Sequence, residues 1–359
     1  MKTIIAEIKE LFRAERLYFY LLVALVTFYA VILVASRMAP DQLSRAERGL
    51  QMKEAVWKET PQAPHEFQAR WSERAKVSWT FKISNYLLMA AIGLGIWLSS
   101  KDLYQWYLKK EVIPPSAKFL NIGWGISEVV KVVILFILCG TVVNIGFVIV
   151  KFLYLAAVPG SILILAQAFV LDVIAVFLMV GVIRKHGSAL RDLLGFDVLN
   201  ISLREIWLGA RTYFVILPIF FVMLILMILA ASWLRYEPPP HPLVGVFLKE
   251  GPLSPWLIAA SMLLACFIGP VVEEIFFRGF LYPALRRYWG IPWSMVVTAG
   301  LFAAVHENLF AFIPIFFLGL VLAYLYQKRD NLVPCISLHV MHNVAFITYF
   351  FLIKSALTG

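Results

Sequence analysis

The amino-acid sequence predicts an all-α polytopic membrane protein with about eight to nine transmembrane helices. Hydrophobic residues occupy 61% of the 359 positions and charged residues only 15%, and the mean hydropathy is +0.82. Soluble domains carry about 25% charged residues, so a water-soluble globular fold is excluded. The apolar residues are gathered in long runs, several of which can cross ~30 Å of hydrocarbon as a helix.

Nine apolar runs, the seventh of them short, are expected to cross the membrane. A charged amphipathic segment precedes the first run, which starts at Leu17 and lacks a clear small-x-small cleavage site. We therefore interpret this run as an anchor and not as a signal peptide. The nine runs lie at 17–36, 82–99, 129–150, 162–183, 212–234, 256–278, 292–306, 309–326 and 333–353.

Three segments between the runs divide the chain. Residues 37–81 form a polar extramembrane insertion, and Leu190–Arg211 mixes apolar and charged residues with the spacing of an interfacial amphipathic helix. The prolines of Glu237–Pro242 cannot be helical. We expect an N-terminal membrane region at 1–189, with four spans and the 37–81 insertion, followed by a membrane core at 190–353.

The distribution of basic residues predicts the orientation. With a cytoplasmic N-terminus, most Lys and Arg residues of the short loops fall on the cytoplasmic side, as in most membrane proteins. The C-terminus is then on the opposite side of a cytoplasmic (inner) membrane. The formal net charge of +10 is spread over several membrane-proximal loops, which favours contact with anionic lipid headgroups and no nucleic-acid partner.

A group of ionisable residues stands at the end of an apolar stretch that runs from Ile258 to Val272. Glu273 and Glu274 follow this stretch, and Arg278 comes one helical turn later. Charges at membrane depth are costly and usually functional. Glu274 and Arg278 share a helix face at i, i+4 and are expected to form a salt bridge, which leaves Glu273 as the less committed carboxylate and the candidate general base.

Two further spans contribute polar groups. His306 lies one turn after Phe302, whose ring is expected to pack against the imidazole, and His339 and Asn343 share a face of the last span. Water activated by Glu273 and His306, with His339 and Asn343 donating to an oxyanion, would hydrolyse a peptide bond. We expect a polar cavity within the last four spans and no cofactor. Zinc held by Glu273, His306 and His339 is the alternative.

Three motifs, in this order, resemble those of a known family. Glu273-Glu274-Ile-Phe-Phe-Arg278, Phe302-Ala-Ala-Val-His306 and His339-Val-Met-His-Asn343 are similar to motifs of the CAAX prenyl protease and bacteriocin-processing (abortive infection, CPBP) family of glutamate-dependent intramembrane proteases. The resemblance covers roughly residues 190–353. It implies a type II CAAX endopeptidase that acts on a membrane peptide or protein. Glu273 would then be the base, assisted by His306, Glu274 and Arg278 would orient the site, and His339 and Asn343 would form the oxyanion hole.

Two other functions also fit the sequence, and the expected membrane depths of two motifs disagree. A non-catalytic membrane scaffold of the same fold and a secondary transporter are the alternatives. The expected span boundaries place Glu273 near one end of its helix and His306 near the opposite side of the membrane. The motifs meet only if these helices are broken or the boundaries are wrong. Two other membrane-depth charges, Asp172 and Lys131 with Glu128 at i−3, are interpreted as structural ion pairs.

Overall fold

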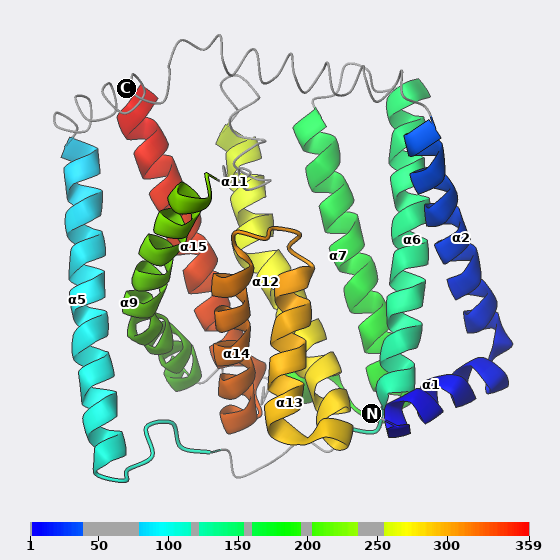
Figure 1. The fold of residues 1–359 in the computed structure, drawn as a ribbon, viewed down its shortest axis with the longest axis horizontal. Coiled ribbons are helices and arrows are strands. Elements are labelled where there is room, and N and C mark those ends of the chain that lie inside the picture. The colour runs from blue at the N-terminus through cyan, green and yellow to red at the C-terminus, as the bar shows by residue number, and fades with distance from the viewer. Residues whose placement is uncertain are drawn as a thin grey trace. The chain divides into compact units, whose positions relative to one another are not determined.

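The structure is a computed structural model that describes residues 2–38, 79–115, 122–153, 160–194, 203–235 and 255–358. All regular elements in these ranges are helical (Figure 1). Most of the polar insertion predicted at 37–81, and the proline-rich loop at 237–242, lie outside the described residues.

Eight helices among the described residues are long and apolar enough to span a membrane, which confirms the predicted fold class. Their apolarity, and not a polar/apolar face, marks them as membrane helices, because lipid and protein surround them on all sides. The candidate spans are Arg16–Ala35, Phe81–Tyr107, Ile126–Leu153, Ile162–Lys185, Leu203–Leu234, Pro255–Ala304, Phe312–Arg329 and Leu332–Tyr349.

The helices that carry these spans belong to two compact units. The larger comprises Met1–Leu11 and Ala90–Phe346, and the smaller comprises Phe12–Met89 and Ile347–Gly359. All candidate site residues lie in the larger unit. Its helices are α6 (Ile126–Leu153), α7 (Gly160–Lys185), α8 (Leu190–Leu194), α9 (Leu203–Leu234), α14 (Phe312–Arg329), most of α5 (Trp79–Tyr107) and α15 (Leu332–Thr358), and the broken helix Pro255–Ala304.

The broken helix contains two of the predicted spans. It runs through α11 (Pro255–Leu263), the π-helix η1 (Leu264–Ile268), α12 (Gly269–Glu274), the π-helix η2 (Ile275–Leu281) and α13 (Tyr282–Ala304). At Gly290 the backbone leaves helical geometry with a φ of 68°, and Pro292 follows. Glycine adopts this positive φ without a steric penalty, and proline readily opens the next helix.

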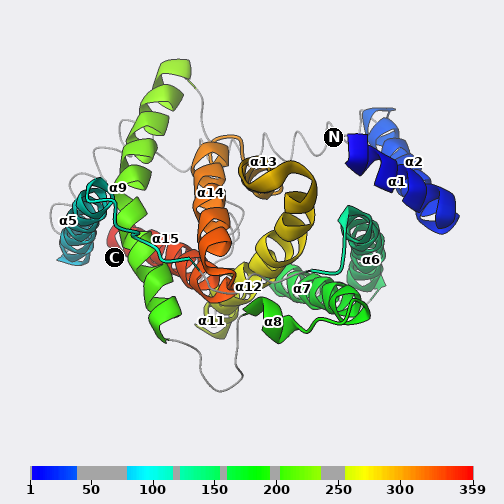
Figure 2. The ribbon, with the colours of Figure 1, turned by 90° about the horizontal axis from the view of Figure 1, so that it is seen from below.

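The chain folds back at Gly290, and this resolves the inconsistency in depth. In a straight helix, residues 277 and 302 would be ~37 Å apart, whereas the ring centroids of Phe277 and Phe302 are 5.1 Å apart. Glu274 stands 16 residues before Gly290 and His306 stands 16 residues after it, so the two motifs reach similar depths. The predicted boundary at 278 was therefore wrong, because the sixth span continues well beyond Arg278. Figure 2 shows how α13 curves next to α14.

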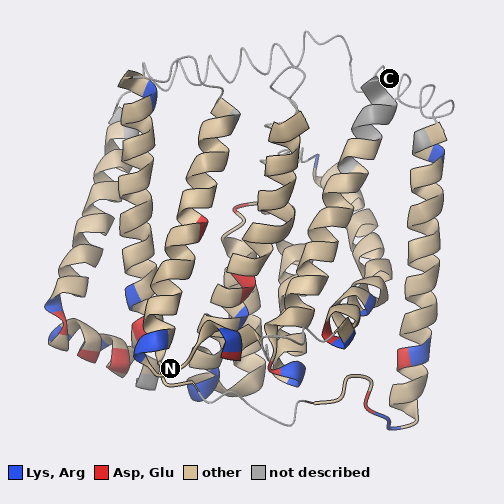
Figure 3. Cartoon of the chain, turned by 180° about the vertical axis from the view of Figure 1, so that it is seen from behind, with Lys and Arg blue, Asp and Glu red and all other residues tan. Residues whose placement is uncertain are grey.

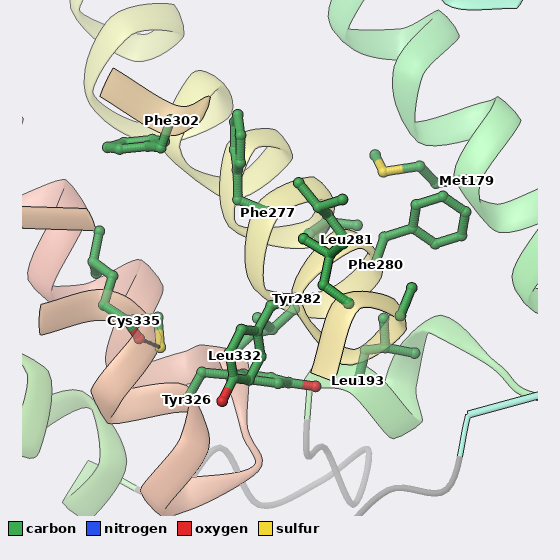
Figure 4. Packing of buried hydrophobic residues seen from close by; sticks show 14 of the residues in the cluster. Met179, Leu193, Phe277, Phe280, Leu281, Tyr282, Phe302, Tyr326, Leu332 and Cys335 are labelled. Atoms are coloured by element: carbon green, nitrogen blue, oxygen red, sulfur yellow. Dashed lines mark hydrogen bonds between the residues drawn. The ribbon is translucent and has the colours of Figure 1, made fainter. Parts of the chain in front are cut away.

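Side chains from α7, η2, α13, α14 and α15 form the core around this broken helix (Figure 4). Trp124, which is fully buried before α6, stacks on Phe280 with a centroid distance of 5.5 Å and donates its indole N–H to the Phe280 carbonyl at 3.1 Å. A π-helix leaves some carbonyls without their usual donors. Trp124 therefore supplies a donor to η2 and fixes the start of α6 against it.

The structure describes the two ends of the predicted interfacial helix Leu190–Arg211, since residues 195–202 lie outside the described ranges. Leu190–Leu194 form α8, but from Leu203 the residues belong to α9, which is a candidate span, so the interfacial assignment was wrong there. Ion pairs explain the charges that suggested an interface: Glu205 pairs with Arg329, and Arg211 pairs with Asp102. Both pairs tie α9 to neighbouring helices of the same unit.

Several charged residues lie in the end turns of the helices (Figure 3). In α6, the predicted pair of Lys131 with Glu128 is present near the start at 3.2 Å, and Lys151 lies in the last turn. Arg184 and Lys185 end α7, and Lys328 and Arg329 end α14. The apolar remainder of each helix matches the composition expected in hydrocarbon.

Candidate active site

Glu274 and Arg278 form the buried salt bridge that their spacing predicts. Arg278 Nη1 donates to Glu274 Oε1 at 2.6 Å, and the side chains are 1% and 0% exposed. Arg278 also donates to the Gly319 carbonyl of α14 at 3.3 Å and lies 4.3 Å from the ring centre of Phe302. These contacts hold η2 against α13 and α14.

His339 of α15 joins this pair. Its Nδ1 lies 2.8 Å from Glu274 Oε1, the same oxygen that accepts from Arg278. An ionised carboxylate only accepts hydrogen bonds, so Nδ1 carries the proton. Nε2 is then the nitrogen left for chemistry, and it lies 3.8 Å from Glu273 Oε2. Glu274 therefore sets the tautomer of His339 and aims its other nitrogen at Glu273.

Glu273 is the less committed carboxylate, as predicted from the sequence. Its side chain is 38% exposed, yet its Oε2 atom is buried and has no hydrogen-bond partner among the described residues. Buried carboxylate oxygens are normally paired, and exceptions often mark functional groups. Glu273 Oε2 is thus an available acceptor beside His339.

His306 and His339 are brought together by one aromatic ring. Phe302 packs edge-on against both imidazoles, with centroid distances of 4.9 Å to His306 and 5.6 Å to His339. The predicted contact between Phe302 and His306 is thereby confirmed. His306 Nδ1 lies 2.7 Å from the Phe302 carbonyl, which only accepts, so Nδ1 is the donor. The Nε2 of neutral His306 is free to take a proton.

Asn343 has a structural partner that the sequence did not reveal. Its Nδ2 donates to the Ala265 carbonyl in η1 at 2.9 Å. That carbonyl lacks a helical donor, because the Gly269 N–H bonds to Leu264 and the next residue is Pro270, which has no N–H. Asn343 therefore supplies the donor that the Ala265 carbonyl lacks in the π-helix before Glu273. The second proton of its amide nitrogen remains available to an oxyanion.

Sequence reasoning singled out Asp172 but did not place this carboxylate near the candidate base Glu273. Asp172 is half-buried on α7, which packs against α12, and its electrostatic neighbour is Glu273. In the described part of the chain Asp172 has no ion-pair partner, so the interpretation as a structural pair does not hold there. The signal was the lone charge in the middle of an apolar span.

No group of three or more His, Cys, Asp or Glu side chains among the described residues is arranged to hold a metal ion. This includes Glu273, His306 and His339, which the sequence suggested as zinc ligands. Two of them, Glu273 and His339, lie near each other. Both histidines use Nδ1 for other partners, so only their Nε2 atoms would be available to an ion.

The fold and the grouped side chains define an integral membrane protein with a glutamate–histidine site inside its helices. Residues 255–345 match the model of the family described as type II CAAX prenyl endopeptidase, Rce1-like. The match confirms the resemblance predicted from the three motifs and contains all six motif residues. It begins at the broken helix, later than the predicted start at 190. No match was found among curated proteins or solved structures.

Proposed function

We propose that this protein is an intramembrane endopeptidase in which Glu273 activates water. The match to a protease family supports this reaction class. The observation that carries the proposal is the unpartnered Glu273 Oε2, 3.8 Å from a His339 Nε2 whose direction is set by Glu274. A water molecule between these two atoms would lie within hydrogen-bond reach of both.

The proposed reaction has two steps. Glu273 takes a proton from water while the oxygen attacks the scissile carbonyl carbon, which gives a tetrahedral oxyanion. The C–N bond then breaks, and the amine leaves with the proton that Glu273 took from water, delivered either directly or through His306 Nε2, so that both side chains return to their starting state. Asn343 would donate a hydrogen bond to the oxyanion, and His339 would donate another when its Nε2 also carries a proton, each worth about 3–4 kcal/mol.

The substrate class follows from the family and the location of the site. We propose a membrane-associated or C-terminally anchored peptide as the substrate, with peptides prenylated at a CAAX-type C-terminus as one member of this class. The site lies on helices that cross the membrane, so the scissile bond must reach it from the bilayer or its surface. We assign the protein to the cytoplasmic membrane with its N-terminus in the cytoplasm, on the basis of its basic loop residues.

The test uses purified protein in liposomes and a library of anchored peptides that includes prenylated and unprenylated CAAX-type pairs. Mass spectrometry should find two fragments whose summed mass exceeds that of the peptide by one water. Cleavage should persist after chelation and metal removal, whereas its loss would favour a metal enzyme. Peptide binding without cleavage would indicate a scaffold, and solute flux without cleavage would indicate a transporter.

A further inference from the structure

A hollow with a volume of about 530 Å³ lies away from the glutamate site. Its walls come from the end of α5, the segment that follows α5, and the end of α14. Three lysines, Lys109, Lys110 and Lys328, and three aromatic residues, Trp106, Tyr107 and Tyr324, line it. Hollows of this volume are large enough to bind a small molecule or a lipid headgroup.

The lysines of this hollow lack opposing charges. Among the described residues none of the three forms an ion pair, whereas nearby Arg211 and Arg329 are paired with carboxylates. Glu111 is the acidic residue of the lining, so the hollow keeps a formal charge of +2. Unneutralised lysines around a concave surface attract anions more strongly than isolated surface charges do.

The backbone that carries two of these lysines has a fixed and unusual shape. The N–H of Lys109 bonds to Trp106 at 2.9 Å, and that of Lys110 bonds to Gln105 at 2.9 Å, which closes α5 in a Schellman turn. Lys109 occupies the left-handed position with a φ of 56°, where glycine is usual. A lysine in this left-handed position has a steric cost that glycine would avoid, which indicates a binding role for its side chain.

The opposite wall is tied to this turn. Arg329, next to Lys328, donates to the Pro114 carbonyl at 2.7 Å while it pairs with Glu205 of α9. Ile113 is buried in the core of the unit. The segment after α5 is therefore anchored at its far end, and Lys328 is held beside it.

Aromatic side chains place this hollow at the surface of a bilayer. Trp106 and Tyr107 are 68% and 75% exposed, and Tyr324 is 44% exposed. Trp and Tyr concentrate at the level of lipid headgroups, and lysines there bind lipid phosphates. The last turns of α7 and α14 are both basic, and the last turn of α14 includes Lys328. Both turns lie on the same side of the larger unit (Figure 3).

We propose that this hollow binds a phosphate-bearing anion, and specifically the headgroup of an anionic phospholipid. Lys109, Lys110 and Lys328 would contact the phosphate, and the three aromatic rings would lie against the glycerol and upper acyl chains. The site is independent of the proposed peptide hydrolysis, because it shares no residue with the glutamate site.

The test is native mass spectrometry of the detergent-purified full chain, titrated with phosphatidylglycerol or with phosphatidylcholine. A pocket variant carries Lys109→Gln, Lys110→Gln and Lys328→Gln. A control variant carries Lys101→Gln, Arg184→Gln and Arg191→Gln, which removes three basic charges outside the hollow. The wild type and the control should hold phosphatidylglycerol in preference to phosphatidylcholine, and the pocket variant should bind it about 100-fold more weakly.

Equal losses in the two variants would overturn the proposal, because binding would then follow total charge alone. An unchanged pocket variant would overturn it as well. Inorganic phosphate is the second probe. If it displaces phosphatidylglycerol from the wild type and binds the wild type but not the pocket variant, the hollow is an anion site for soluble phosphates and not for a lipid headgroup. Thermal unfolding of each variant confirms that the substitutions leave the fold intact.

Discussion

Replacing Arg278 with methionine tests whether the buried pair holds the site together. The substitution removes the 2.6 Å contact with Glu274, the hydrogen bond to Gly319 and the cation beside Phe302. It leaves a carboxylate that is 0% exposed with His339 as its remaining partner. Breaking one side of such a pair typically costs about 3–5 kcal/mol, and the Coulomb energy of two charges ~4 Å apart at an effective dielectric constant of 20 is about 4 kcal/mol.

The assay is the free energy of unfolding in one detergent, measured beside the cleavage rate. The double variant Glu274→Gln/Arg278→Met removes both charges and should regain most of the lost stability, since replacing both members of a buried pair is often nearly neutral. It should still cleave slowly, because glutamine does not direct His339 as a carboxylate does. An Arg278→Met variant within about 1 kcal/mol of wild type, with no gain in the double variant, would refute this reasoning.

Three other predictions follow from individual contacts. Asn343→Asp replaces the amide that donates to the Ala265 carbonyl with a group that has no donor at neutral pH. This should lower the free energy of unfolding by about 1–3 kcal/mol. If kcat falls by more than the fraction of folded protein does, Asn343 has an oxyanion role as well. Gly319→Ala should destabilise the α13–α14 contact by about 1–3 kcal/mol, because its Cβ would stand 2.9 Å from Ala299 Cα. In the control Gly300→Ala the nearest neighbour of the new Cβ is 4.0 Å away, so this variant should be neutral or stabilising in thermal unfolding. Burial raises the pKa of Glu7 in α1 (Lys2–Ala14), but hydrogen bonds from Tyr288 and Ser127 outweigh it and lower the pKa below 4.5. A lowered folded-state pKa contributes stability that is present above the unfolded value and is lost as pH falls through the folded value, so wild type should lose stability relative to Glu7→Gln on acidification below about pH 4.5, and parallel curves would contradict the assignment.

Local spacing predicted the parts of the site that lie within one helix. The i, i+4 spacing gave the Glu274–Arg278 pair and the contact of Phe302 with His306, because helix geometry alone decides which side chains meet. The uncommitted state of Glu273 followed by elimination. These predictions needed no knowledge of how the helices pack.

The contacts between helices could not be predicted in the same way. His339 bonds to Glu274 across 65 residues of sequence, and nothing in either motif gives that register. The bond of Asn343 to Ala265 depends on a π-turn followed by Pro270, a feature that hydropathy does not detect. Apolarity also located the sixth span but not its end, since η2 and the start of α13 continue the helix through Arg278 to the turn at Gly290.

The single-turnover rate of peptide cleavage by Glu273→Gln tests the central claim most directly. Glutamine keeps the size of the side chain and removes its basicity, so the rate should fall by about 10²–10⁴-fold, the range of general-base catalysis, while thermal unfolding stays near that of wild type. Glu307→Gln, which changes an exposed glutamate next to His306, is the matched control and should cleave normally. A folded Glu273→Gln protein that cleaves at the wild-type rate would contradict the account.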